Sequence, residues 1–212
     1  GLGTYLLLGQ VMGGGMGMPR FEAAEVGNLE LAWLIPLALV GTVCGWLYFV
    51  SEHASEALSH AIGERPVVKA MLAGLALAIC GTVLPYTMFA GETQADVLME
   101  TYLTIPAGVL IATGLVKAML TPALINMGWR GGHFFPVIFS GVSLGYGLAI
   151  LTGADPVFCV AVCTASTMGA VMRQPVMVVG LLLMCFPLKG IVCMIIAAVI
   201  AAGIPLPKPL RK

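Results

Sequence analysis

Long apolar runs separated by short polar or glycine-rich interruptions make up most of this chain. A run of about 20 apolar residues is long enough to cross roughly 30 Å of hydrocarbon as a helix. The run 31–50 meets this length, whereas several later runs are shorter than a full crossing. The apolar runs are 31–50, 66–84, 105–125, 137–151, 157–172, 176–186 and 191–204. This pattern predicts an all-α integral membrane fold of tilted and broken transmembrane helices that meet inside the bilayer.

The first long run predicts a helix that continues past the membrane. It follows a polar loop at 20–30 and extends into 51–60, where polar residues gather on one face. Gly41 and Gly45 form a GxxxG pair, which lets another helix approach closely. Three aromatic residues toward its ends are expected to anchor it at the membrane interfaces: Trp33, Trp46 and Tyr48.

Two groups of polar residues have spacings that could serve a cation. His53, Glu56 and His60 are three and four residues apart, but a solvated helix end explains them equally well and is favoured. Three carboxylates spaced by four residues share one helical face, for which a short peripheral or re-entrant helix with a wet side is favoured. They are Glu92, Asp96 and Glu100.

The most unusual stretch is 128–136, which reads Gly-Trp-Arg-Gly-Gly-His-Phe-Phe-Pro between two apolar runs. Three glycines and a proline in nine residues interrupt a helix. Inside a membrane such a break must be buried in protein or line a polar cavity. If a helix resumes at Pro136, its first N–H groups lie near His133 and Phe134, which predicts an anion site.

The composition agrees with a membrane protein. Hydrophobic residues make up 59% of the chain and charged residues 9%, with a mean hydropathy of +1.02, whereas soluble domains carry about 25% charged residues. The formal net charge is zero, so a nucleic-acid partner is not expected. The six cysteines lack metal-binding spacing and are expected in the core, and we expect no metal or cofactor.

Both ends of the chain have a character of their own. Residues 1–10 are apolar and 11–19 are glycine-rich, and the start resembles the tail of a helix that begins upstream rather than a signal peptide. Three of the last five residues are cations, which predicts a cytoplasmic C-terminus.

The stretch Gly132-His133-Phe134-Phe135-Pro136 matches the GxFxP motif of the CLC family of chloride channels and proton-coupled anion antiporters. Downstream, 165–175 resembles the family's alanine-rich segment, which ends in arginine and then proline and leads into the dimer-interface helices. The helix at 31–60 and the turn at 85–93 also have counterparts. The resemblance implies that 1–212 is the C-terminal repeat of the transmembrane domain, one half of the inverted-repeat CLC fold, and a fragment without a soluble domain.

The resemblance also implies the site. The backbone amides of His133 and Phe134 would face the anion, and no side chain would be catalytic. The motif and pore support would come from Gly131, Gly132, Phe135, Pro136, Lys117 and Arg130. The family's gating and proton glutamates belong to the other half, and its coordinating tyrosine on the last helix has no counterpart here.

The roles of several side chains stay open at this stage. His133 could titrate beside the anion, but outward packing of its ring is favoured. Arg130 could line a vestibule or extend to an interface. Lys117 must face the protein interior, because an unpaired charge in the bilayer costs about 3 kcal/mol; it could support the anion path or bind a backbone carbonyl. Arg173 is expected to anchor a helix junction.

The function implied by the resemblance is chloride transport, as a voltage-gated-type channel or a proton/chloride antiporter. The expected partners are a chloride or other halide ion, membrane lipid, a second copy in a homodimer and the N-terminal half of the same transporter. We expect a multi-pass protein of the plasma membrane. The alternative is a non-transporting membrane assembly unit that dimerises through its GxxxG faces and its terminal helices. An enzyme is not expected, since no base accompanies Cys159 and Cys163.

Overall fold

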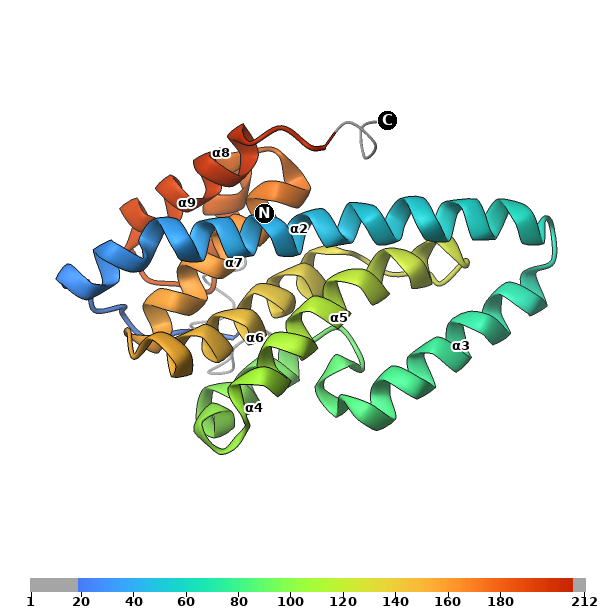
Figure 1. Ribbon diagram of the computed structural model, residues 1–212, viewed down its shortest axis with the longest axis horizontal. Helices are drawn as coiled ribbons and strands as arrows, with labels where there is room; N and C mark the ends of the chain where they lie inside the picture. Colours follow the sequence, from blue (N-terminus) through green and yellow to red (C-terminus); the bar gives the residue numbers. More distant parts are fainter. Residues whose placement is uncertain (1–18, 208–212) are drawn as a thin grey trace, which may run out of the picture.

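The structure is a computed structural model, and it describes residues 19–207. These residues form helices and connecting segments without a strand (Figure 1). The helices are α2 (Asn28–Ile62), α3 (Pro66–Val83), η1 (Pro85–Thr87), α4 (Glu92–Thr101), η2 (Tyr102–Thr104), α5 (Ala107–Asn126), α6 (Phe134–Thr152), α7 (Pro156–Met172), α8 (Pro175–Leu182) and α9 (Ile191–Gly203).

Four helices are long and apolar enough to cross a membrane: α2, α3, α5 and α6. The helices α7 and α9 are apolar but shorter. Three of the α-helices begin with a proline at their first position, where the missing N–H has no intrahelical acceptor to lose. The predicted mixture of full and partial helices is therefore confirmed.

The helix α2 runs along most of the length of the molecule (Figure 1). It continues through 51–60 as predicted, and it ends at Ile62, before Gly63, whose φ of 70° is favourable for glycine. Its polar extension is attached to α5. The Ser51 hydroxyl donates to the Met119 carbonyl at 2.6 Å, and the Asn126 amide donates to the Glu52 carbonyl at 3.0 Å. These bonds fix the C-terminal end of α5 against α2.

The centre of the core is α7, which packs against α2, α6 and α9. Glycines on its neighbours make this packing possible. A Cβ at Gly45 would lie 2.5 Å from the Cβ of Ala170, and a Cβ at Gly145 would lie 2.8 Å from the backbone nitrogen of Val160. Gly41 likewise has no room for a side chain beside Ser166. The predicted GxxxG pair therefore holds α2 against α7 within the chain.

The six cysteines are all free thiols, and five of them are buried. Their small apolar side chains fill the helix contacts, as predicted.

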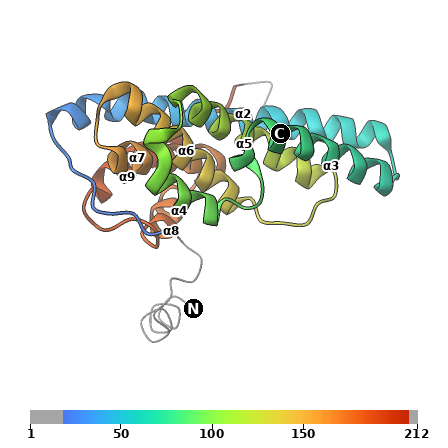
Figure 2. The ribbon, with the colours of Figure 1, turned by 90° about the horizontal axis from the view of Figure 1, so that it is seen from below.

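The helix α3 contrasts with this core. Figure 2 shows α6, α7 and α9 gathered at one end of the molecule and α3 at the other. Only Ala73 and Gly81 of α3 are buried. A Cβ at Gly81 would lie 2.8 Å from Met88, so the end of α3 packs on the turn that follows it. Most other apolar side chains of α3 are exposed, whereas Leu77 and Cys80 are half-buried.

The helix α4 is short and has one wet face, as expected. Ala95 and Leu98 are buried, whereas Asp96 and Glu100 are exposed. Partial burial, followed by repulsion from Glu100, raises the pKa of Asp96.

Three local predictions are wrong. The helix α6 begins at Phe134 rather than Pro136, because a proline in the first turn has no intrahelical bond to lose. Tyr48 is 8% exposed and lies in the core instead of at an interface. The segment 20–30 is not simply a polar loop: Asn28 already begins α2, and Phe21 stacks on Phe186 with ring centroids 4.4 Å apart.

The structure does not describe three features that the sequence analysis named: the apolar start at 1–10, most of the glycine-rich segment 11–19, and the three C-terminal cations.

The helix α8 ends at Leu182, four residues before the end of its apolar run.

Candidate functional site

The connection between α5 and α6 is the broken stretch that the sequence predicts. Two backbone hydrogen bonds form a turn where this connection leaves α5. The Gly128 N–H donates to the Ile125 carbonyl at 2.9 Å, and the Trp129 N–H donates to the Leu124 carbonyl at 3.1 Å. Gly128 has a φ of 95°, which an L side chain rarely adopts. From 129 to 133 the chain is not helical, and most of this segment is exposed.

The first turn of α6 presents backbone donors. The first helical bond runs from Val137 N to the His133 carbonyl at 3.1 Å. Pro136 has no N–H, and within residues 19–207 the N–H groups of His133, Phe134 and Phe135 make no hydrogen bond. Three free donors at the positive end of a helix dipole form an arrangement suited to an anion.

The side chain of His133 packs against aromatic rings. It stacks on Phe134 with ring centroids 4.6 Å apart and an interplanar angle of 21°, and its ring lies 6.5 Å from that of Tyr48. The His133 ring therefore packs against its aromatic neighbours, and its role beside an anion stays a prediction. Sequence reasoning did not find the contact from Tyr48, because it placed that residue at a membrane interface.

Lys117 lies in the interior, as its position in an apolar helix requires. It is 4% exposed, and its Nζ donates to the Thr87 carbonyl at 2.7 Å and to the Phe89 carbonyl. Both acceptors belong to the turn around η1, where Phe89 has a φ of 59°. Lys117 therefore ties α5 to the segment that follows α3.

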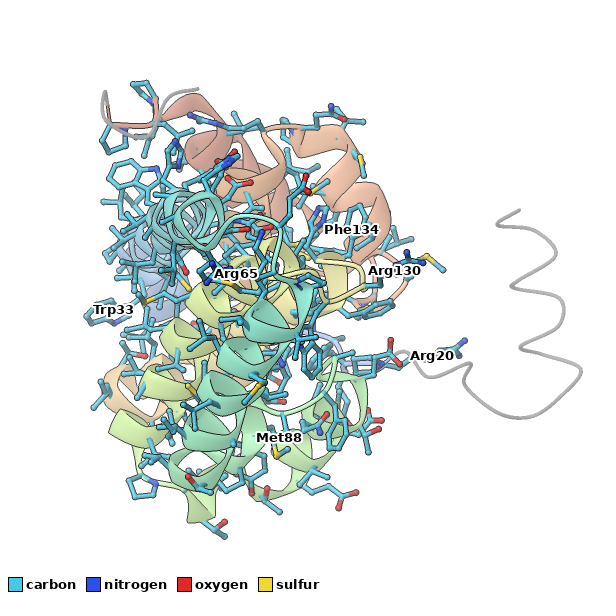
Figure 3. The ribbon with its side chains drawn as sticks, turned by 90° about the vertical axis from the view of Figure 1, so that its right-hand side faces the viewer. Arg20, Trp33, Arg65, Met88, Arg130 and Phe134 are labelled. Carbon is cyan, nitrogen blue, oxygen red and sulfur yellow. The ribbon has the colours of Figure 1, made fainter. Side chains whose placement is uncertain are left out.

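Lys117 also lines a cavity of about 290 Å³ with Arg130, Gly131, Gly132 and Pro136. His133 and Phe134 are not part of its lining. The predicted motif residues thus divide into two groups, one around the α6 amides and one around this cavity. Figure 3 shows Arg130 and Phe134 on the same side of the molecule, opposite Trp33.

Arg173 is outside both groups. Its guanidinium donates to the Ala202 carbonyl at 2.8 Å and to the Ile204 carbonyl at 2.6 Å. It therefore joins the end of α7 to the end of α9, and the predicted role at a helix junction is confirmed.

The described part of the chain contains no cluster of three histidine, cysteine or acidic side chains that could hold a metal ion. His53, one of the residues considered for such a site, contacts the Phe49 carbonyl through Nδ1 at 2.9 Å.

Comparison with solved structures identifies a protein with a similar fold. A structure described as the crystal structure of a CLC-type fluoride/proton antiporter matches with a TM-score of 0.74 and 20% sequence identity. The match covers 96% of this chain and 52% of that one, so the chain spans about half the length of the similar structure. A comparison with curated proteins gave no match.

Comparison with protein families gives the assignment. The family model described as the voltage gated chloride channel matches residues 4–205, which is nearly the whole chain. The matched region contains the broken stretch, the amides of α6 and the buried Lys117. This chain belongs to the voltage-gated chloride channel family, the CLC family.

Proposed function

We propose that this chain supplies one half of a transmembrane pathway for chloride or a similar halide. The observation that carries this proposal is the set of free N–H groups at His133, Phe134 and Phe135, at the start of a helix whose remainder is mostly buried. A helix of 19 residues aligns its peptide dipoles behind these donors.

Backbone amides suit a transported ion because they bind it without a full charge. A site in a conducting path must be favourable enough to fill and weak enough to release the ion. Lys117 and Arg130 lie in the neighbouring cavity and do not replace the amides as ligands. Their charges would raise the local potential and increase the concentration of halide near the break. Phe134 would form a partly dehydrated wall.

The exposed side of the break supports a second part of the proposal. Arg130, Gly131 and Gly132 are exposed in this chain, although broken backbone inside a membrane must be covered by protein or line a cavity. We propose that the N-terminal half of the same transporter covers this side and completes the ion path, so that 1–212 acts as the C-terminal repeat. No cofactor is required for this chemistry.

The proposed assembly is a homodimer in the plasma membrane with a cytoplasmic C-terminus. Its support is the row of exposed apolar side chains on α8 and α9, among them Val176, Val192 and Val199. Membrane lipid would cover the remaining apolar surface, including that of α3. The mass of the detergent-solubilised transporter, measured by light scattering, tests the dimer.

A purely structural role for the chain has less support. That alternative uses GxxxG faces and terminal helices for dimerisation, and the first of these is taken, because Gly41 and Gly45 already contact α7 inside the chain. They are not available to a second copy.

The test uses the complete transporter that contains this chain, reconstituted in liposomes. His133→Pro removes one amide donor, and it requires the φ of −92° at His133 to change by about 27° to reach the value of about −65° that proline adopts. His133→Ala is the matched control, since it keeps the amide and removes only the imidazole. We expect halide efflux to fall at least tenfold in His133→Pro and to change less than threefold in His133→Ala. Equal efflux from both variants would place the anion site elsewhere.

The same assay addresses the mode of transport. External pH is followed during efflux: proton movement in a fixed ratio to halide identifies an antiporter, and halide movement without it identifies a channel.

A further inference from the structure

The start of α6 is not held in place by the segment that leads into it. Among the described residues, Trp129 is the last one before α6 with a backbone bond to α5, and it lies four residues before His133. Four extended residues can span about 14 Å, and an added Cβ at Gly131 or Gly132 would meet nothing within 4 Å. His133 is the N-cap of α6, yet its side chain makes no capping hydrogen bond. Contacts outside this segment therefore decide where the first turn lies.

The helix α2 supplies contacts on both sides of the break. On the α5 side, the Asn126 amide donates to the Glu52 carbonyl at 3.0 Å and to the Ser55 hydroxyl at 2.9 Å. On the α6 side, Tyr48 lies against His133 with ring centroids 6.5 Å apart and an interplanar angle of 58°. Tyr48 and Ser55 are seven residues apart, so these contacts lie within about 10 Å along α2. Two turns of one helix therefore hold both ends of the break.

Tyr48 is itself held firmly, as a positioning group has to be. It is buried, and its ring packs edge-on against that of Phe49 with ring centroids 5.7 Å apart. Its helix is fixed one turn earlier, where Gly45 lets α2 lie directly against α7. On the other side of the contact, the His133 ring stacks on Phe134. A continuous set of contacts thus runs from the core helix α7 to the residues whose N–H groups are free.

We propose that Tyr48 is a positioning residue for the transported anion, and that it sets the halide affinity of the α6 amides through the His133 ring. Tyr48 does not touch the ion. Its ring limits how far His133, and with it the first free N–H groups, can move. This inference rests on the proposed function, because the amides have to be the halide site. It adds that a side chain 85 residues earlier in the sequence controls the affinity of that site.

A loosened donor weakens an anion site without removing it. Hydrogen bonds depend steeply on distance and angle, so a first turn with more freedom directs its N–H groups at the ion less often. Loss of the Tyr48 ring should therefore raise the halide concentration that gives half-maximal flux more than it lowers the maximal flux. A general loss of folded protein would instead lower the maximal flux alone.

The experiment measures halide flux through the complete transporter in liposomes as a function of halide concentration. We expect Tyr48→Leu to raise the half-maximal concentration about two- to threefold and to leave the maximal flux within about twofold of the original. Tyr48→Phe keeps the ring and should restore the original half-maximal concentration. An unchanged value in Tyr48→Leu, or the same rise in Tyr48→Phe, would overturn the proposal.

Tyr146→Leu is the matched control. Tyr146 is also a buried tyrosine on a long helix, and its ring stacks on Tyr102 with ring centroids 4.5 Å apart. It lies 12 residues beyond Phe134, or about 18 Å along α6. Both leucine variants should lower the midpoint of thermal unfolding, but Tyr146→Leu should leave the half-maximal concentration unchanged. An equal rise in both variants would overturn the proposal, because it would follow from lost packing in general.

A double variant tests whether Tyr48 acts through His133. His133→Ala removes the other ring of the contact and keeps the amide, so it should raise the half-maximal concentration by the same factor of about two to three. Because the two rings form one contact, Tyr48→Leu should add little, less than about 1.5-fold, in the His133→Ala background. A full further rise would show that Tyr48 acts by another route and would overturn the proposal.

His133→Pro separates this inference from the proposed function. If flux in His133→Pro equals that in His133→Ala, the amides are not the halide site, and both the proposed function and this inference fail. If His133→Pro loses flux but Tyr48→Leu leaves the half-maximal concentration unchanged, this inference alone fails.

Discussion

Glycines serve opposite purposes in two regions of this molecule. In the helix core around α7, Gly141 and Gly145 lie directly against backbone atoms of the neighbouring helix, and an added Cβ would collide with them. In the break before α6, a Cβ at Gly128, Gly131 or Gly132 would meet nothing within 4 Å. In the core, glycine is required because a side chain would have no space. In the break, a side chain would have space at these three positions.

The difference teaches how stability and function are divided in this chain. Close approach in the core brings backbones together and supplies the packing that stabilises helices in a membrane. The break contributes little packing, and it leaves backbone donors and the exposed Arg130 accessible. Substitutions in the core should therefore change folding, and substitutions in the break should change what the chain binds.

The largest effect is expected for Gly145→Val. The nearest atoms to an added Cβ are the backbone Cα and N of Val160, which cannot move without displacing α7. Overpacking of this kind costs about 3 kcal/mol or more. The midpoint of thermal unfolding in detergent, followed by circular dichroism, should fall strongly. Gly180→Ala on α8 has open space around it and serves as the control; an equal loss in both variants would contradict the packing argument.

The second largest effect on stability is expected for Lys117→Met. This variant tests whether the region around the break contributes to the free energy of unfolding. Removal of the ammonium group leaves the carbonyls of Thr87 and Phe89 without their donor. The cost of an unsatisfied buried acceptor is about 1–3 kcal/mol. Lys117→Arg should recover part of the loss in the same unfolding measurement. If the methionine variant were more stable than the original, the free energy cost of burying the Lys117 charge would exceed the stabilisation from its two hydrogen bonds.

A smaller effect separates backbone strain from steric space within the break. Gly128→Ala places a side chain at a φ of 95° and should destabilise the protein by about 1–2 kcal/mol. Gly131→Ala, without such a φ, should leave the free energy of unfolding within about 0.5 kcal/mol of the original. Chemical unfolding of the two variants side by side makes the comparison. If they unfold alike, strain at Gly128 is not the reason for its glycine.

The smallest effect on stability is expected for Arg130→Gln. Arg130 is exposed, so the free energy of unfolding should change by less than about 0.5 kcal/mol. Halide efflux at low ionic strength should nevertheless fall, and the difference should shrink as an inert salt of an impermeant anion is added, because salt screens exposed charges. An effect that does not depend on ionic strength would point to a structural role for Arg130.

Much of the fold follows from the sequence because the membrane restricts what a chain can do. Runs of apolar residues predicted the helices, and the small residues at Gly41 and Gly45 predicted a close helix contact. The interior position of Lys117 followed from the cost of an unpaired charge, and its burial confirms it. These arguments need only local composition and length.

The parts that failed depend on contacts between distant segments. The acceptors of Lys117 lie 28 and 30 residues away, and no spacing rule identifies a carbonyl in a turn. Tyr48 was placed at an interface because aromatic residues near the ends of apolar runs often lie there, but it is buried beside Phe49 and the distant His133. The roles of His133, Phe134 and Arg130 in ion transport stay predictions.

The bond pair of Arg173 has a consequence for how the chain is made. Its guanidinium leaves the ribosome 29 and 31 residues before the two carbonyls that accept from it. Until α9 has been synthesised and has docked, this cation has no such partner among the apolar helices, which is unfavourable by a few kcal/mol in a membrane. The end of α7 therefore reaches its final position late in biosynthesis, when the last described helix has inserted. A chain interrupted before Ile204 would leave the Arg173 guanidinium without the Ile204 carbonyl that accepts from it.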